Sequence, residues 1–212
     1  MTIEEALRAL ERFQGDSLTE SLAKIESDVI GASQDNIADF CATNQINDRF
    51  MDSALSVKRL AGQINVIIHA AGILKSLDGI LDEGELVESV SLGAGNTGRR
   101  FDLETNLRIA EYKFIDWQGG SESIRQNGIF KDFFELAEYE TSKRKYLYVV
   151  GTKYPLKFFN GGRSLTSVLS RHTKIHASIK DKYGAEVKKV SDYYLLKKDE
   201  VDIVDVSPFI GR

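Results

Sequence analysis

The sequence has very few cysteines and prolines and no unbroken apolar run near the length of a membrane span. Among 212 residues, Cys41 is the single cysteine, and Pro155 and Pro208 are the only prolines. One thiol can form neither an internal disulfide nor a thiolate metal cluster. A spanning helix needs about 18 consecutive apolar residues. We therefore expect no membrane association and a cytoplasmic protein.

The overall composition is that of a soluble folded protein, with 42% apolar and 28% charged residues. The first residues, MTIEEALRALERF, are acidic and amphipathic. A secretory signal has a basic start followed by an unbroken apolar stretch. We expect no cleaved signal here.

Charge is distributed unevenly along the chain, although the net charge is only -4. Residues 143–189 contain twelve Lys or Arg and two acids, a local excess of ten positive charges. This asymmetry favours a basic surface for a polyanion such as nucleic acid, and the alternative is the solvated faces of a helix and a hairpin. The cations that could follow a phosphate backbone are Arg125, Lys131, Lys143, Arg144, Lys145, Lys153 and Lys157.

The first fifty residues carry the signals of short helices. Thr2 and Ser17 each precede a glutamate by three residues, the pattern of a capping box, and Gly15 and Gly31 supply stops. A longer helix is predicted over residues 47–81, with an apolar stripe wide enough for a largely buried helix. The stripe consists of Ile64, Ile67, Ile68, Ala71 and Leu74. We expect a helical N-terminal region over residues 1–53.

The pattern then changes to that of a sheet. Alternating runs at 86–92, 99–104 and 108–115 predict a three-stranded antiparallel meander. A helix beginning at Ser123 follows, and then a short apolar strand at 146–150. The residues of that helix expected to face a core are Ile124, Phe130, Phe133, Phe134 and Ala137.

The predicted fold class is α/β, with a core over residues 54–160 in the order helix, three strands, helix, strand. Residues 161–212 are expected to pack on that core. They would add a basic helix over 164–183 and two strands near 193–196 and 201–206.

Two carboxylates and a lysine are expected to converge on the hairpin that the predicted strands at 99–104 and 108–115 form. Glu111 and Lys113 share one face of a strand because side chains alternate. If the turn centres on Asn106 and Leu107, residues whose numbers sum to 213 lie opposite, which puts Asp102 against Glu111 with Cβ atoms about 5 Å apart. Close carboxylates need a compensating cation, and Mg²⁺ prefers hard oxygen ligands. A lysine beside them suits phosphodiester hydrolysis.

The segment from Phe101-Asp102 to Glu111-Tyr112-Lys113, within this order of elements, resembles the PD-(D/E)XK nuclease superfamily. That superfamily includes restriction endonucleases and Holliday-junction resolvases, and the resemblance covers about residues 60–151. It implies a restriction-endonuclease-like core, metal binding by Asp102 and Glu111 aided by the Tyr112 carbonyl, and Lys113 serving the attacking water. Phe101 stands in place of the family's proline, at a position that varies in the family.

The family often uses a further acid on the first helix, and the apolar middle of that helix has none here. Glu85 or Glu88, from the neighbouring strand, could substitute. Gln118 follows Lys113 at a distance that could reach a phosphate.

These residues and the resemblance together predict an endonuclease that uses Mg²⁺ or Mn²⁺ and could form a homodimer through its helical regions. DNA is expected over RNA only because most of the resembled family acts on DNA. Two alternatives remain open. The charges could be ordinary cross-strand pairs, and the chain could be a non-catalytic nucleic-acid or protein-binding module that retains a nuclease fold.

Two other motifs point elsewhere. The run GAGNTG at 93–98 matches the G-x-G-x-x-G dinucleotide pattern, which requires a helix immediately afterwards; a strand is predicted instead. It leaves a nucleotide-dependent enzyme as a third reading. His172 and His176 have the spacing of two zinc ligands on one helix, but a packed histidine is the better interpretation of each. His69, on the long helix, is also expected to be structural, and the alternative that it reaches the hairpin site stays open.

Overall fold

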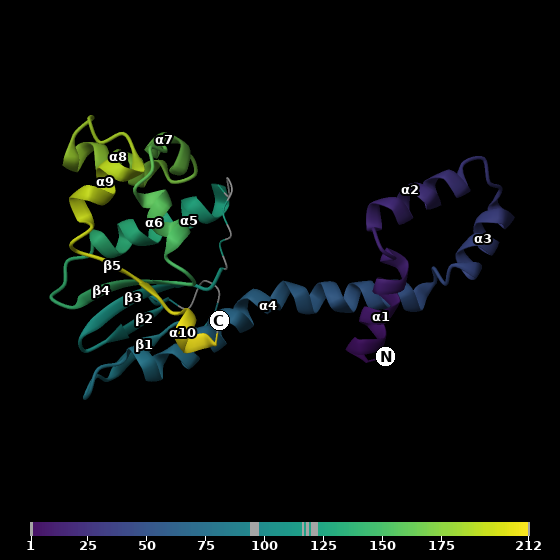
Figure 1. The fold of residues 1–212 in the computed structure, drawn as a ribbon, viewed down its shortest axis with the longest axis horizontal. Coiled ribbons are helices and arrows are strands. Elements are labelled where there is room, and N and C mark those ends of the chain that lie inside the picture. The colour runs from purple at the N-terminus through teal and green to yellow at the C-terminus, as the bar shows by residue number, and fades with distance from the viewer. Residues whose placement is uncertain (1, 94–97, 116, 118, 120–122, 212) are drawn as a thin grey trace. The chain divides into compact units, whose positions relative to one another are not determined.

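The computed structural model describes residues 2–93, 98–115, 117, 119 and 123–211. The chain divides into two compact units, Met1–Asn65 and Val66–Arg212. The boundary falls inside α4, a helix of 33 residues that runs over Asp48–Ile80. This helix therefore belongs to both units (Figure 1).

Three short helices precede α4: α1 (Ile3–Gln14), α2 (Leu18–Val29) and α3 (Gln34–Thr43). The predicted capping box at Thr2 is confirmed, because its hydroxyl accepts a hydrogen bond from the Glu5 N–H and the Glu5 carboxylate accepts one from the Thr2 N–H. At Ser17 the side chain caps α2 by accepting from the N–H of Glu20. Gly15 ends α1 with a positive φ of 59°.

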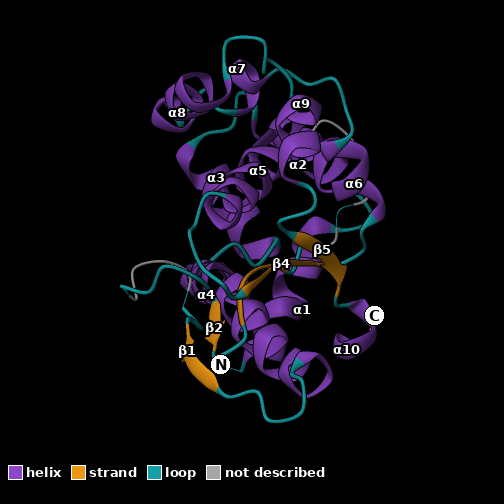
Figure 2. Ribbon diagram, turned by 90° about the vertical axis from the view of Figure 1, so that its left-hand side faces the viewer, coloured by secondary structure: helices purple, strands orange, loops and turns teal. Residues whose placement is uncertain are grey.

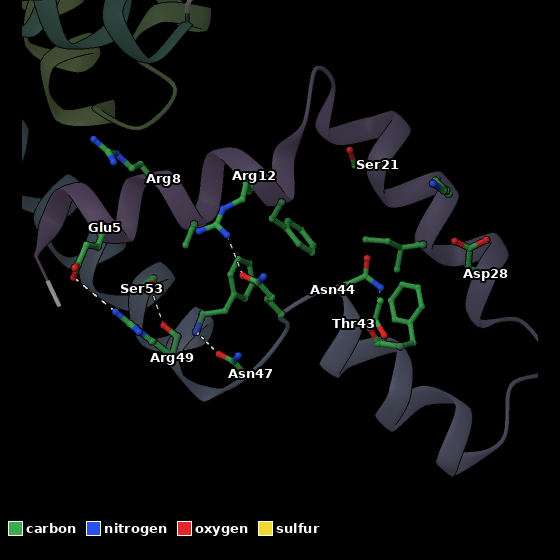
Figure 3. A pocket seen from close by; sticks show the side chains of 17 residues that line it. Glu5, Arg8, Arg12, Ser21, Asp28, Thr43, Asn44, Asn47, Arg49 and Ser53 are labelled. Atoms are coloured by element: carbon green, nitrogen blue, oxygen red, sulfur yellow. Dashed lines mark hydrogen bonds and ion pairs between the residues drawn. The ribbon is translucent and has the colours of Figure 1, made fainter.

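The first unit has almost no core of its own. Among its described residues only Ala6 and Ser53 are buried. A hollow of about 770 Å³ lies among α1, α2, α3 and the start of α4. Figure 3 shows side chains from these helices around it, with Arg49 reaching toward Glu5 at 3.8 Å. These helices are held by local capping more than by packing.

The second unit is built on a mixed sheet of five strands in the order β1-β2-β3-β4-β5. The strands are β1 (Val87–Val90), β2 (Leu103–Thr105), β3 (Arg108–Lys113), β4 (Arg144–Val149) and β5 (Asp202–Asp205). The first three are antiparallel neighbours, whereas β4 lies parallel to β3 and β5 parallel to β4. The α/β class is confirmed, and β5 adds a strand beyond the predicted meander.

Helices cover both faces of this sheet (Figures 1 and 2). One face packs against α5 (Ser123–Ala137), and α6 (Lys153–Phe159) and α7 (Leu165–Val168) pack on α5 in turn; Ile109 and Leu147 point into this layer. The other face packs against the second half of α4 and against α10 (Ser207–Ile210), with Ala110 and Tyr112 pointing there. Successive residues of β3 thus point into different layers, as the pleat requires.

The predicted hairpin register is confirmed. Leu103 pairs with Ala110 and Glu104 with Ile109, so paired residue numbers sum to 213. The turn is fixed by the Thr105 hydroxyl, which accepts hydrogen bonds from the N–H groups of Leu107 and Arg108 at 3.0 and 2.9 Å. Asp102 therefore lies opposite Glu111.

The C-terminal prediction was wrong in two places. The expected helix over 164–183 is divided into α7 and α8 (Thr173–Tyr183), because the backbone of His172 leaves the helical region, with φ -128° and ψ 53°. The expected strand near 193–196 is part of a helix, α9 (Val190–Lys197). Val190 and Tyr193 are both buried at a spacing of three, which only a helix can bring to one side. The strand predicted near 201–206 is confirmed as β5.

The prediction of a largely buried α4 was also wrong. Its apolar stripe is exposed, while Ile73 and Ser76, on another side of the helix, are buried. An apolar stripe predicts that a helix has a face to cover, but not that the same chain covers it. Ile124 at the start of α5 is likewise 78% exposed, although Phe130, Phe133 and Ala137 are buried as expected.

Among the described residues, one helix is long and apolar enough to cross a membrane by length and composition alone. It is α4, whose mean hydropathy reaches 1.3 over an 18-residue window.

Candidate active site

The hairpin of β2 and β3 brings the predicted site residues together. Asp102 immediately precedes β2, and Glu111 and Lys113 end β3. The confirmed register sets Asp102 opposite Glu111, close enough that the charge of Asp102 acts to raise the pKa of Glu111. Both Glu111 and Lys113 point to the face of the sheet that α5 covers, since Asp132 of α5 contacts Lys113.

Asp102 is held from two sides. One carboxylate oxygen accepts a hydrogen bond from the backbone N–H of Tyr112 at 2.9 Å. The other lies 3.3 Å from Nε2 of His69, which also lies 3.3 Å from the carbonyl oxygen of Ser91. Because a carbonyl can only accept, Nε2 carries the proton and donates. Burial acts to raise the pKa of Asp102, but the hydrogen bonds from His69 and Tyr112 outweigh it and lower that pKa.

Lys113 is held by an acid from the covering helix. Its ammonium forms an ion pair with the carboxylate of Asp132, whose side chain is only 9% exposed. Burial acts to lower the pKa of Lys113, but the charge of Asp132 prevails and raises it. The pKa of Asp132 is also raised, by burial, with Lys113 opposing. Lys113 is therefore a fixed, protonated donor.

Glu111 is a strongly perturbed acid of the group. Burial, followed by the negative charges of Asp132 and Asp102, raises its pKa from 4.5 to about 9. The carboxyl is therefore protonated at neutral pH while no cation is bound. Asp102, Glu111 and Asp132 place three carboxyl groups beside one lysine. A bound divalent cation would offset the repulsion between them when they are ionised.

Asp132 is the residue of this site that the sequence did not predict, and His69 is one whose contact it left open. The signal for Asp132 was available, since it is the one acid among the mostly apolar buried residues of α5, next to Phe133. His69 was expected to be structural, with contact to the site left open, because its position on a preceding helix does not fix how that helix packs. Only the packing of α4 under the sheet brings it to Asp102.

The other candidate polar residues have different partners. Glu85 forms a buried ion pair with Arg108 and accepts a hydrogen bond from Thr105. Glu88 pairs with Lys143 at 2.6 Å. Both acids therefore already form ion pairs, away from the end of the hairpin that carries Asp102 and Lys113. Gln118 lies outside the described residues.

The basic segment is partly neutralised within the chain. Lys143 pairs with Glu88 and Glu104, and Arg144 with Asp82. Lys145 donates a hydrogen bond to the carbonyl of Ala137. Exposed cations remain on α6, on α8 and in the loops beside α8: Lys153, Lys157, Arg171, Lys174, Lys180, Lys188 and Lys189. These, and not the residues at 143–145, are the available contacts for a polyanion.

The two other motifs do not form the sites that they resemble. Residues 94–97 of the glycine-rich run lie outside the described residues. The described segment 98–102 contains no helix, and β1 and β2 are antiparallel, which is not the arrangement of a dinucleotide-binding loop. His172 precedes α8 while His176 lies within it, so the two do not share a helix face.

A divalent cation fits the donors of the hairpin site by type. Carboxylate oxygens are the ligands that Mg²⁺ prefers, and Asp102 and Glu111 supply them. In the described part of the chain, no three His, Cys, Asp or Glu side chains are already arranged as metal ligands. The physical reason is visible at this site: Asp102 is directed to His69 and to a backbone N–H, and Asp132 to Lys113.

Comparison of the chain with models of protein families, with curated proteins and with solved structures finds no match.

Proposed function

We propose that the chain is a metal-dependent nuclease that hydrolyses the phosphodiester bonds of nucleic acid, with DNA as the first substrate class. The observation that supports this most strongly is the convergence of Asp102, Glu111 and Lys113 at one end of the β2–β3 hairpin. The proposed cofactor is Mg²⁺ or Mn²⁺, held by Asp102 and Glu111.

We further propose that α4 to β4 form a core of the PD-(D/E)XK, restriction-endonuclease-like kind. The elements follow the order α4, β1, β2, β3, α5, β4. An aspartate stands before the second strand, and Glu-x-Lys ends the third. The mixed sheet with a parallel β3–β4 pair supports the same arrangement.

Each polar residue has a distinct role in this proposal. A bound cation would polarise the phosphate and lower the pKa of its water. Lys113, protonated and fixed by Asp132, donates a hydrogen bond to a phosphate oxygen or to the attacking water and offsets developing negative charge. His69 and Asp132 are positioning residues, because they act on Asp102 and Lys113. Glu111 must release its proton before it can bind a cation, so cation uptake is coupled to proton release.

The exposed cations of α6 and α8 supply the electrostatic part of substrate binding. Lys153 and Lys157 lie on α6, and Lys174 and Lys180 on α8. Contacts of this type go to phosphates and carry no sequence information. Cleavage without strong sequence preference, and binding that weakens as salt rises, are the consequences.

The proposal is tested by incubating the purified full chain with supercoiled, linear and single-stranded DNA and with RNA, each with Mg²⁺, Mn²⁺ or EDTA. Cleavage is expected only with metal, and Lys113→Ala, Asp102→Asn and Glu111→Gln should each reduce its rate by about 100-fold or more. The matched control is Glu104→Gln, which removes an acid of the same hairpin that is paired with Lys143. That variant should cut like the wild type.

Asp132→Asn separates positioning from binding. It should lower the cleavage rate at saturating DNA by about 10-fold and leave DNA affinity unchanged, because Lys113 loses its anchor but keeps its charge. Glu135→Gln, on the same helix and paired with Lys131, is the control. If wild-type protein cuts none of the substrates and metal does not raise its melting temperature, the proposal fails and a non-catalytic binding module takes its place.

A further inference from the structure

The hollow of the first unit is lined by the kind of charge that this part of the chain has least of. Residues 1–53 contain eleven acids and four cations. All four cations line the hollow, but only two of the acids do. The cations are Arg8, Arg12, Lys24 and Arg49, and the acids are Glu5 and Asp28. A gap left by loose packing would carry the charge that the region has in excess, so this distribution favours an anion as the occupant.

The contacts that two of these cations make within the chain are weak. Arg12 of α1 donates a hydrogen bond at 3.0 Å to the side-chain oxygen of Gln45, which is a neutral amide and does not offset the charge (Figure 3). Arg49 of α4 lies 3.8 Å from Glu5, and 74% of its side chain is exposed. An ion pair between exposed side chains contributes little. Both guanidinium groups can therefore take an external anion in place of these contacts.

Aromatic rings form another part of the wall. Phe13 of α1, Phe40 of α3 and Phe50 of α4 line the hollow. The rings of Phe13 and Phe50 contact each other, with centroids 5.0 Å apart. All three side chains are only partly buried. A flat aromatic group in the hollow would cover apolar surface that the chain itself leaves open.

Side-chain amides supply hydrogen-bonding groups beside the rings. The nitrogen of Asn44 donates to the carbonyl of Phe40, and the oxygen of Asn47 accepts from the N–H of Phe50. Among the described residues, these contacts leave the oxygen of Asn44 and the nitrogen of Asn47 for a ligand, one acceptor and one donor. Gln45, between them, is the one described non-glycine residue with a left-handed φ, at 56°. Such a conformation costs free energy and is often kept where it positions a binding group.

The hollow also has the size of a small-molecule site. Its volume is about 770 Å³, within the range of about 300–1,000 Å³ that such sites have. A nucleotide carries a phosphate for the cations, a flat base for the rings and an edge of donors and acceptors for the amides. An inorganic phosphate or an acidic peptide would engage the cations and leave the rings uncovered.

We infer that the first unit binds a nucleotide in this hollow. The nucleotide is either free in solution or the end of a nucleic-acid strand, since both present the same groups. Every residue that lines the hollow lies between positions 5 and 53. The inference therefore does not depend on the candidate active site of the second unit.

The experiment is titration calorimetry of the full chain in EDTA, which removes any binding through a divalent cation at the hairpin. The probes are ATP, GTP, CTP and UTP, the nucleoside of whichever binds best, pyrophosphate, and a single-stranded DNA of about five nucleotides. At least one nucleotide should bind about 10-fold more tightly than its nucleoside or pyrophosphate, because both halves are held at once. Tighter binding of the oligonucleotide than of every nucleotide would identify the strand end as the source.

Variants assign the binding to the hollow. Arg12→Gln with Lys24→Gln should weaken nucleotide binding by about 100-fold, since each charged hydrogen bond contributes roughly tenfold. Arg12→Lys should weaken it less, because the charge remains and only the planar donor group is lost. The control is Lys58→Gln with Arg59→Gln, which removes two exposed cations of the same unit that lie outside the hollow and should bind like the wild type. Circular dichroism should show equal helix content throughout, since the changed side chains are exposed.

Three results would overturn the inference. The first is that neither a nucleotide nor the oligonucleotide binds to the wild type. The second is that pyrophosphate binds as tightly as the best nucleotide, which would show a simple anion site. The third is that the hollow variant and the control variant lose the same affinity, which would show attraction to the charge of the unit as a whole.

Discussion

At the scale of single residues, the ion pair of Glu85 and Arg108 ties the start of β1 to the β2–β3 turn. The Glu85 carboxylate is fully buried and accepts a hydrogen bond from Arg108 Nε at 2.6 Å. Burial acts to raise the pKa of Glu85, but the hydrogen bonds and charge of Arg108 outweigh it and lower that pKa from 4.5 to about 2. The stabilisation is therefore complete above pH 4.5 and is lost as the pH falls toward 2.

Replacing Glu85 should destabilise the fold in a pH-dependent way. Glu85→Gln leaves Arg108 buried with only the half-exposed Asp82, at 3.3 Å, as a counter-charge, and should lower the free energy of unfolding by about 3 kcal/mol at pH 7. The difference from wild type should shrink near pH 2, where the native carboxylate is itself protonated. Urea unfolding at both pH values measures this. Glu88→Gln, which breaks a half-exposed pair with Lys143, should cost less than about 1 kcal/mol, and an equal loss in both variants would contradict the argument.

Glu111 should make the metal-free protein less stable in base. Its folded pKa of about 9 lies above the ordinary value of 4.5, so stability is complete below pH 4.5 and is lost as the pH rises toward 9. In EDTA at pH 8, Glu111→Gln should be more stable than wild type by about 2 kcal/mol, because the amide carries no proton to lose. Thermal melts with and without Mg²⁺ measure this. Mg²⁺ should stabilise the wild type more than the variant, and a wild type at least as stable as the variant in EDTA would refute the pKa argument.

At the scale of elements, the close contact of α4 with β3 sets the position of His69. An added Cβ on Gly72 would meet the Phe114 ring at 2.5 Å, whereas at Gly62, on the same helix, it would meet nothing within 4 Å. Gly72→Ala should therefore lower stability by about 1–3 kcal/mol through overpacking. Gly62→Ala should be neutral or raise stability by up to about 1 kcal/mol through helix propensity. Chemical unfolding of both variants measures this, and equal effects would show that α4 can move away from Phe114 without cost.

Elements that depend on local signals were predictable from the sequence. Thr2 and Ser17 place the starts of α1 and α2 because a cap needs only neighbouring residues. The two-residue turn of the hairpin fixed the pairing of Asp102 with Glu111 for the same reason.

Features that depend on distant packing were not predictable in the same way. Tyr193 and its aromatic neighbour have high β propensity, yet packing against α5 places them in α9, where the Tyr193 hydroxyl donates a hydrogen bond to Glu138 at 2.7 Å. His69 and Asp132 reach the candidate site from helices far away in sequence. Whether a helix face is buried also depends on what packs on it, and among the described residues the side chains of the α4 stripe are exposed.

At the scale of the whole molecule, the two units should differ widely in local stability. No residue of α2 or α3 is buried, whereas β3 and β4 lie between covered faces. Hydrogen exchange should therefore be fast in α2 and α3 and limited by global unfolding in β3 and β4. Mass spectrometry of peptic fragments measures this, and equal protection in both groups would mean that the first unit is packed far better than its exposed side chains indicate.

The contacts among Glu85, Thr105 and Arg108 also restrict the length of the β2–β3 hairpin. A turn of two residues, held by the Thr105 hydroxyl, leaves no slack between the strand that follows Asp102 and the strand that carries Glu111. Because one inserted residue would send every later side chain of β3 to the opposite face, this hairpin can vary in composition at its tip but not in length. An insertion there would disable the candidate site while every residue of that site remained unchanged.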